Sequence, residues 1–371
     1  MLKKNKVIII IASYNGQNYW PGLMPLLSQE KYHDFDLEIL VVDNNSSDQS
    51  VAYLRENYPE VKLIVNKENT GFVGANNIGY QYAVQQKADF IYLLNQDTVI
   101  ESGFLQPLYD FAKQNKFGSL QSKLRLWDKQ DRINTIGNAI HFLGFGFSKK
   151  SGQVDDNKQK ISQINYASGA GVFISMAALR DLGGLFDETM FMYLEDLDLG
   201  WSLQLLGYDN YLIPESIIYH KYEFSRGMKH LHWFERNRIW TMLKNYKLPT
   251  LIMILPACLI MEIGQLFFAL MNKRFWQKIR AYSFLLSPRQ LRVLLKKRKY
   301  IQAKRKRSDR QVVYKFSGRI LFQPLDSVLL KISNFVFGFS EFTIFFDASC
   351  PLNDDGLCTS ILPMLVFIVA G

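Results

Sequence analysis

Residues 7–16 read VIIIIASYNG, an unbroken apolar run that ends in a polar turn. A run of this kind is typical of a strand that is buried on both faces of a parallel sheet. Three further runs, 37–42, 61–65 and 90–94, follow it with helix-like segments between them. Strands that alternate with helices predict an α/β fold with a mostly parallel sheet, because parallel neighbours are joined by crossover helices.

Polar side chains follow three of these strands at the point where each strand ends. Asp43 and Asn44 follow the second strand, Gly71 closes a loop after the third, and Asn95 and Asp97 follow the fourth. In an open α/β sheet, ligands bind at the carboxyl ends of the strands. The topology therefore predicts that these residues, although far apart in the sequence, lie at one edge of the sheet.

Two of the carboxylates have both a structural and a functional interpretation. Asp97 suits a Mg²⁺ or Mn²⁺ ion shared with a diphosphate, since magnesium favours one or two carboxylates plus phosphate oxygens and water. A cap on the turn at Thr98 explains the same residue equally well. Asp43 either caps the following helix or accepts hydrogen bonds from a nucleoside, and the run of polar residues after it favours the nucleoside.

A second group of acids, Glu195, Asp196 and Asp198, lies in a mostly apolar stretch. Neighbouring carboxylates beside apolar walls have pKa values that are pushed apart, which suits one of them to general-base catalysis. The alternative is a solvated helix start, where acids are favoured by the helix dipole.

Three later residues are ambiguous when taken alone. His220 ends a late strand, and a lone histidine is more often structural than a ligand. Arg236 and Arg238 suit neutralisation of a diphosphate, but a solvated helix face over aromatic packing explains them as well.

The charge and hydropathy of the chain divide it into three parts. The protein has 371 residues and a net charge of +10, yet residues 273–310 carry 15 Lys and Arg against one acid, so the remainder is mildly acidic. An apolar run, 251–271, precedes this basic segment and is just long enough to span a bilayer. We expect a catalytic domain at 1–248, a membrane-associating segment at 249–310 that favours an anionic membrane surface over nucleic acid, and an extension of unknown role at 311–371.

Seven segments of the chain, taken in order, resemble the family 2 inverting glycosyltransferases with the GT-A fold, closest to rhamnosyltransferase-like members. The resemblance covers about two thirds of the chain and rests on the order and spacing of the segments. They are ASYN at 12–15, VVDNNSSD at 41–48, NTGFVGANN at 69–77, LLNQD at 93–97, GAG at 169–171, FMYLEDLD at 191–198 and RNR at 236–238.

The resemblance implies a division of labour among the residues. Asp97 matches the last position of the family's metal-binding Asp-X-Asp element, with Asn95 where an acid is often found, and His220 matches a further ligand to Mg²⁺ or Mn²⁺. Asp196 matches the catalytic base, with Glu195 in support. The residues implied to bind the nucleotide sugar are Ser13, Tyr14, Asn15, Asp43, Asn44, Gly71, Asn76, Asn95, Arg236 and Arg238.

The reaction implied by the resemblance is metal-dependent, inverting transfer of a hexose in cell-surface polysaccharide biosynthesis. L-rhamnose from dTDP-rhamnose is the expected donor, with glucose, galactose or an amino sugar left open. The expected acceptor is a lipid-linked saccharide at the cytoplasmic face of a bacterial membrane.

Other function classes fit the sequence less well. A sugar nucleotidyltransferase would carry a glycine-rich loop with a basic residue after the first strand, and 13–17 has neither. A dehydrogenase would carry Gly-x-Gly-x-x-Gly there. A non-catalytic membrane scaffold, or a nucleic-acid binder that uses 296–310, remains an alternative.

Overall fold

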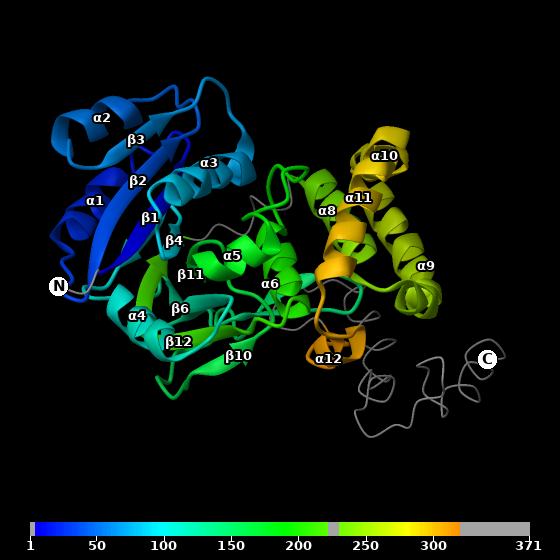
Figure 1. Ribbon diagram of the computed structural model, residues 1–371. Coiled ribbons are helices and arrows are strands. Elements are labelled where there is room, and N and C mark those ends of the chain that lie inside the picture. Colours follow the sequence, from blue (N-terminus) through cyan, green and yellow to red (C-terminus); the bar gives the residue numbers. More distant parts are fainter. Residues whose placement is uncertain (1–3, 222–229, 320–371) are drawn as a thin grey trace.

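A mixed β-sheet forms the centre of the fold in the computed structural model, which describes residues 4–221 and 230–319 (Figure 1). The strand order is β10-β12-β6-β11-β4-β1-β2-β3, with β5 paired to β12 and β7 paired to β6. The strands are β1 Asn5–Ser13, β2 Phe35–Asp43, β3 Lys62–Val65, β4 Phe90–Leu94, β5 Thr98–Ile100, β6 Ser119–Leu126, β7 Ile133–Thr135, β10 Ser162–Ile164, β11 Gly171–Ser175 and β12 Asn210–His220. A separate hairpin pairs β8 Asn138–Ile140 with β9 Gly146–Ser148.

The four strands predicted first from the sequence form one parallel half, β4-β1-β2-β3. Strand β11 then enters antiparallel between β4 and β6, and β6 pairs parallel with β12. The expected α/β fold is thus confirmed, and the antiparallel strand is an addition that the apolar runs did not predict.

Helices cover both faces of the sheet because alternate residues of each strand point to opposite faces. In β1, Val7, Ile9 and Ile11 pack in one core with α1 and α4, whereas Ile8 and Ile10 pack in a second core with α3, α5 and α6. The helices of this part are α1 Trp20–Gln29, α2 Ser50–Asn57, α3 Gly71–Gln85, α4 Leu105–Gln114, α5 Met176–Leu182 and α6 Glu195–Leu205.

The C-terminal helices stand together on the side of the molecule away from α1 and α2 (Figure 1). They are α8 Leu231–Asn245, α9 Leu248–Met271, α10 Phe275–Leu286, α11 Pro288–Lys304 and α12 Asp309–Val313. Both α10 and α11 pack against α8. After α12, Ser317 N donates to the carbonyl of Ile140 over 2.8 Å. The domain limits 1–248, 249–310 and 311–371 remain predictions, and most of the last range lies outside the described residues.

Candidate active site

The ends of β1 and β2 lie side by side, which brings two predicted donor-binding residues together. Ser13 is in register with Asp43, and both are about 1% exposed. The Ser13 hydroxyl has no hydrogen-bond partner among residues 4–221 and 230–319. Because a buried hydroxyl without a partner costs free energy, it is suited to a ligand that supplies one.

The loops that follow β1, β2 and β4 are tied to one another. The Asp43 carboxylate accepts from Ser46 N over 2.9 Å and from its hydroxyl over 2.5 Å. Asn15, at φ +49°, donates its backbone N–H to the Ser46 hydroxyl over 2.8 Å. Gln96 exchanges two 3.1 Å hydrogen bonds with the backbone of Tyr14, whose side chain is 48% exposed. The aromatic ring of Tyr14 is therefore exposed, while Gln96 holds its backbone in place.

Asn44 is buried and organises the loop before α3. Its Oδ1 accepts from Thr70 N and Oγ1, each over 2.9 Å, and its Nδ2 donates to the Gly71 carbonyl over 2.9 Å. Gly71 has φ +75°, and an added Cβ would lie 2.4 Å from the carbonyl oxygen of Phe191. Asn76 donates to the carbonyl of Phe72 over 2.9 Å. In this structure Asn44 and Gly71 thus shape the loop, and a direct contact of either with the donor stays a prediction.

Asp97 and His220 come together across the end of the sheet. Oδ1 of Asp97 lies 3.3 Å from Nε2 of His220, whose Nδ1 lies 3.1 Å from Oδ1 of Asn134. An amide oxygen can only accept, so Nδ1 donates to Asn134 and Nε2 is the ring atom that faces the Asp97 carboxylate. A carboxylate and an imidazole nitrogen that lie close together and are oriented by an outer hydrogen bond fit Mg²⁺ or Mn²⁺ as ligands.

This pair supplies only part of a coordination sphere. Within the described ranges, no group of three or more His, Cys, Asp and Glu residues is arranged to hold a metal ion. Oδ1 of Asn95 is buried without a partner in the same part of the chain. An ion bound here would take its remaining ligands from diphosphate oxygens and water, as magnesium sites commonly do.

The two predicted catalytic acids begin α6. Asp196 is half-buried and accepts from Leu197 N over 2.8 Å and from Gly169 N over 3.2 Å. Glu195 is 7% exposed, and its Oε2 has no partner in the described chain. Burial raises the pKa of Asp196, while burial together with the Asp196 charge raises the pKa of Glu195. A carboxyl group whose pKa is shifted toward neutrality is suited to general-base catalysis.

A short stretch of backbone joins these acids to the loop that carries Asp97. Asp196 accepts from Gly169, and the next residue, Ala170, accepts at its carbonyl from Asn95 N over 3.2 Å. Asn95 stands two residues before Asp97. The two predicted catalytic acids and the Asp97–His220 pair therefore share one end of the β4–β11 ladder.

Asn237 has no role of its own in the sequence-based prediction, but it holds the backbone that leads into α6. Its Nδ2 donates to the carbonyls of Met192 and Tyr193 over 2.9 and 2.8 Å. Tyr193 and Leu194 both have positive φ, +68° and +63°, immediately before Glu195. Non-glycine residues are strained in this region, so the surrounding contacts must hold them there. The only signal in the sequence was the place of Asn237 between two arginines of the RNR segment.

Replacing Asn237 by Ala should misplace the acids without removing them. We expect kcat to fall about 10- to 100-fold with the donor KM little changed, because small misplacements of a catalytic group are costly. Steady-state kinetics of nucleotide release measure both parameters. Asn245→Ala is the matched control, since Asn245 is equally buried on α8 but contacts Asp198 instead. Equal losses of kcat in both variants would contradict a positioning role for Asn237.

The two arginines occupy different surroundings. Arg236 lies over the rings of Trp233 and Phe284 and donates to the carbonyl of Thr189 over 2.6 Å. Burial lowers the pKa of Arg236 to about 10, so the residue keeps its charge at neutral pH. Arg238 is enclosed by Glu235, Glu262 and the carbonyl of Leu143. This placement differs from the predicted diphosphate contact, because these internal partners already take up the Arg238 guanidinium.

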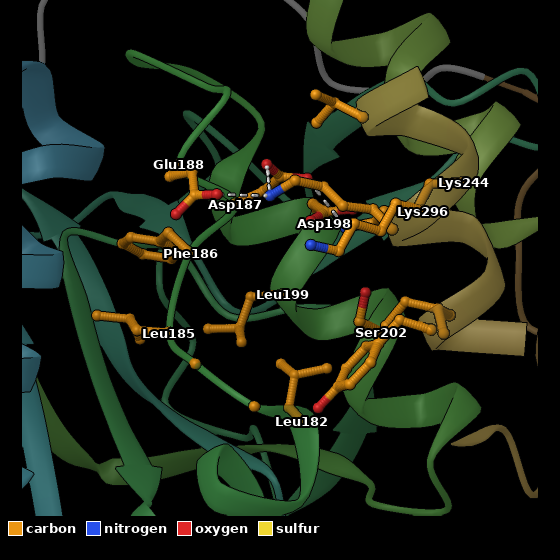
Figure 2. A pocket seen from close by; sticks show the side chains of 16 residues that line it. Leu182, Leu185, Phe186, Asp187, Glu188, Asp198, Leu199, Ser202, Lys244 and Lys296 are labelled. Carbon is orange, nitrogen blue, oxygen red and sulfur yellow. Dashed lines mark hydrogen bonds and ion pairs between the residues drawn. The ribbon is translucent and has the colours of Figure 1, made fainter. Parts of the chain in front are cut away.

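A cavity of about 430 Å³ lies on another flank of α6 (Figure 2). Asp198 lines this cavity. It points away from Asp196 because two residues along an α-helix are rotated by about 200° about the helix axis. Lys244 forms ion pairs with Asp198 and, over 3.7 Å, with Asp187, which also pairs with Lys297 over 2.8 Å. Although burial opposes ionisation of Asp187, Lys244 and Lys297 hold the pKa of Asp187 well below its usual range. Asp198 thus belongs to a compensated charge cluster that fixes α6 to α8 and α11.

Comparisons with known proteins find that the chain is similar to glycosyltransferases. The family profile described as Glycosyl transferase family 2 matches residues 8–183. Three similar proteins are the N-acetylglucosaminyl-diphospho-decaprenol L-rhamnosyltransferase of Mycobacterium tuberculosis, the Glycosyltransferase GlyA of Streptococcus pneumoniae and the Beta-monoglucosyldiacylglycerol synthase of Trichormus variabilis. Their identities are 24%, 25% and 24% over 52%, 64% and 55% of this chain. The matches span 68%, 33% and 42% of those proteins.

A solved structure shares the fold. GalNAc-T7, crystallised with UDP, GalNAc and Mn²⁺, superimposes with a TM-score of 0.53 at 15% identity, over 66% of this chain and 48% of that one. The profile match ends before Glu195, so the acids of α6, His220 and the helix α8 rest on the geometry given above.

Proposed function

Because the chain belongs to glycosyltransferase family 2, we propose that it transfers a hexose from a nucleotide sugar to a saccharide acceptor in cell-surface glycan biosynthesis, with inversion at the anomeric carbon. One observation carries the proposal. Asp196, whose pKa burial raises, is hydrogen-bonded into the same end of the sheet as the Asp97–His220 pair. The proposed base and the proposed diphosphate site therefore lie at the same end of the sheet.

Donor binding is assigned to the strand ends. The unpartnered Ser13 hydroxyl and the Asp43 carboxylate face a nucleoside, while the exposed ring of Tyr14 offers a surface for stacking. Asn15 and Asn76 hold the loops at these strand ends through hydrogen bonds, and the buried Oδ1 of Asn95 is assigned to the donor site. Arg236 adds positive charge for the diphosphate, and Arg238 is assigned to the anchoring of α9.

Asp97 and His220 would hold Mg²⁺ or Mn²⁺, which when bound neutralises charge on the leaving diphosphate. Asp196 accepts the proton of the acceptor hydroxyl as that oxygen attacks the anomeric carbon from the side opposite the diphosphate. Glu195, the less readily ionised neighbour, limits the negative charge beside the base. One displacement, without a covalent intermediate, inverts the anomeric centre.

L-rhamnose from dTDP-rhamnose is the proposed donor, and a lipid-linked saccharide at the cytoplasmic face of the membrane is the proposed acceptor. The name of the mycobacterial relative supports L-rhamnose as the sugar and a lipid-diphosphate saccharide as the acceptor, and the name of the Trichormus enzyme supports a lipid acceptor. Among the described residues, α9 is the one helix that is long and apolar enough to cross a bilayer.

A donor screen tests the proposed activity. The full chain is incubated with Mg²⁺ or Mn²⁺, a lipid-diphosphate saccharide and, in turn, dTDP-rhamnose, UDP-glucose, UDP-galactose and UDP-N-acetylglucosamine. We expect acceptor-dependent nucleoside diphosphate release with one donor and a product of opposite anomeric configuration. Release with retention would overturn the inverting mechanism, and no turnover of any donor would favour a non-catalytic scaffold.

Asp97→Asn should weaken metal use specifically. Loss of the carboxylate charge is expected to raise the Mn²⁺ concentration for half-maximal rate by at least about 10-fold, since loss of an outer hydrogen-bond partner of a metal ligand already costs about 10- to 100-fold in affinity. A titration of rate against Mn²⁺ after chelation measures this. Asp110→Asn, a surface acid on α4, serves as the control. An unchanged metal requirement in Asp97→Asn would exclude this residue as a ligand.

A further inference from the structure

Helix α9 presents a continuous apolar stripe to the outside of the molecule. The exposed side chains recur every three to four residues, which places them along one helical face. They are between 50% and 69% exposed, and they comprise Leu248, Ile252, Leu255, Leu259, Ile263, Phe267 and Leu270. Exposed apolar patches of this extent mark an interaction site.

The polar residues of α9 face the protein. Glu262 forms ion pairs with Arg238 of α8 and, over 2.8 Å, with Lys278 of α10. Gln265 accepts hydrogen bonds from the same two cations. The inward face of α9 thus combines these polar contacts with apolar packing by Ile254, Ala257 and Met261, whereas its outward face is apolar, unlike that of an ordinary surface helix.

The segments that precede and follow α9 in the sequence pack against each other. Helix α8 precedes α9, whereas α10 and α11 follow it, and both of these pack against α8. At the start of α9, Asp309 of α12 accepts from Lys247 N and from the Thr250 hydroxyl, each over 2.7 Å. A single crossing of a bilayer would put the segments before and after α9 on opposite sides, which disagrees with the packing of α10 and α11 on α8 and of α12 on the start of α9.

We propose that α9 lies in the interface of an anionic lipid bilayer and does not span it, although its 24 residues have the length to do so. The bilayer is the favoured occupant because the apolar stripe runs into interfacial residue types: Lys273, Arg274 and Trp276, which is 78% exposed, follow directly. Only part of the basic segment is available to the lipid, since Lys278 and Arg298 are bonded internally. This inference deepens the proposed function by placing the enzyme against a lipid-linked acceptor.

Depth measurements along α9 test the orientation. A nitrobenzoxadiazole label is attached at Ile252→Cys, Leu259→Cys or Leu270→Cys in full chains whose native cysteines are replaced by Ser. Each is bound to phosphatidylcholine–phosphatidylglycerol vesicles that carry shallow or deep spin-label quenchers. We expect all three labels to be quenched alike and mainly by the shallow quencher. A Leu259 label at the bilayer centre with shallow ends would establish a spanning helix, and the absence of any quenching would remove the membrane from the proposal.

A second experiment places acidic side chains on the apolar stripe of α9. Leu259→Glu with Ile263→Glu should reduce vesicle co-sedimentation by at least about tenfold, because acidic side chains are disfavoured in apolar lipid. Val154→Glu, at a site 59% exposed in another part of the molecule, should bind as the unchanged chain does. No donor is present in either experiment, so a failure of glycosyl transfer is distinguishable from a failure of membrane binding. Undiminished binding of the double variant would overturn the assignment of this face.

Discussion

Asp196→Asn should abolish most of the transferase activity while the protein stays folded. The amide cannot accept the proton of the acceptor hydroxyl, and loss of a general base costs about 10²–10⁴ in rate. We expect kcat for nucleoside diphosphate release to fall about a thousandfold, with the donor KM nearly unchanged. A variant that retains a third or more of the rate would show that another group is the base.

Glu195→Gln is the matched control, and the pH profile separates the two acids. Asp196 accepts two backbone hydrogen bonds that favour its anion, whereas Glu195 Oε2 accepts none from the described residues, so Asp196 ionises first. Because burial raises the pKa of Asp196, the rate should decline as the pH falls through that raised value, nearer to neutrality than for an ordinary aspartate. Gln resembles the protonated Glu195, so this acid limb and most of the activity should persist in Glu195→Gln.

Arg238→Met should be the most destabilising single change among those considered. Arg238 is 3% exposed and, with Lys278, balances the carboxylates of Glu235 and Glu262. Removing one member of a buried ion cluster leaves an uncompensated charge and costs about 3–5 kcal/mol. We expect the melting temperature to fall by on the order of 10 °C, as followed by circular dichroism.

The double variant Arg238→Met with Glu262→Gln tests that explanation. It removes one charge of each sign, so the remaining Lys278–Glu235 pair is balanced and much of the lost stability should return. If the double variant is as unstable as the single one, the loss comes from packing of the guanidinium against Phe145 and not from its charge.

The sequence predicted the parallel half of the sheet because each strand there is an apolar run that ends in polar residues. In the GAG segment at 169–171, an added Cβ on Gly171 would lie 2.3 Å from the Ile218 side chain, so this position needs glycine. The proximity of Asp97 and His220 was not deducible from residues alone. It depends on β5 and β12 pairing at the end of the sheet, where Thr98 is in register with His220.

Buried charges account for the main difference between expectation and structure. Arg238 was predicted as a diphosphate contact because an arginine next to aromatic residues has no visible internal partner in the sequence. Its partner Glu262 stands 24 positions away, in a helix whose composition favours lipid. Glu262 interrupts the apolar run in the sequence, but only the packing of α8, α9 and α10 shows what the acid binds.

The position of β12 has a practical consequence for anyone dissecting the chain. This strand covers the edge of β6 along eight paired residues and also holds β5 and β10. A fragment cut at 183, where the family profile match ends, would leave β6 with a bare hydrogen-bonding edge and invite aggregation. The smallest expressible unit must therefore extend beyond His220.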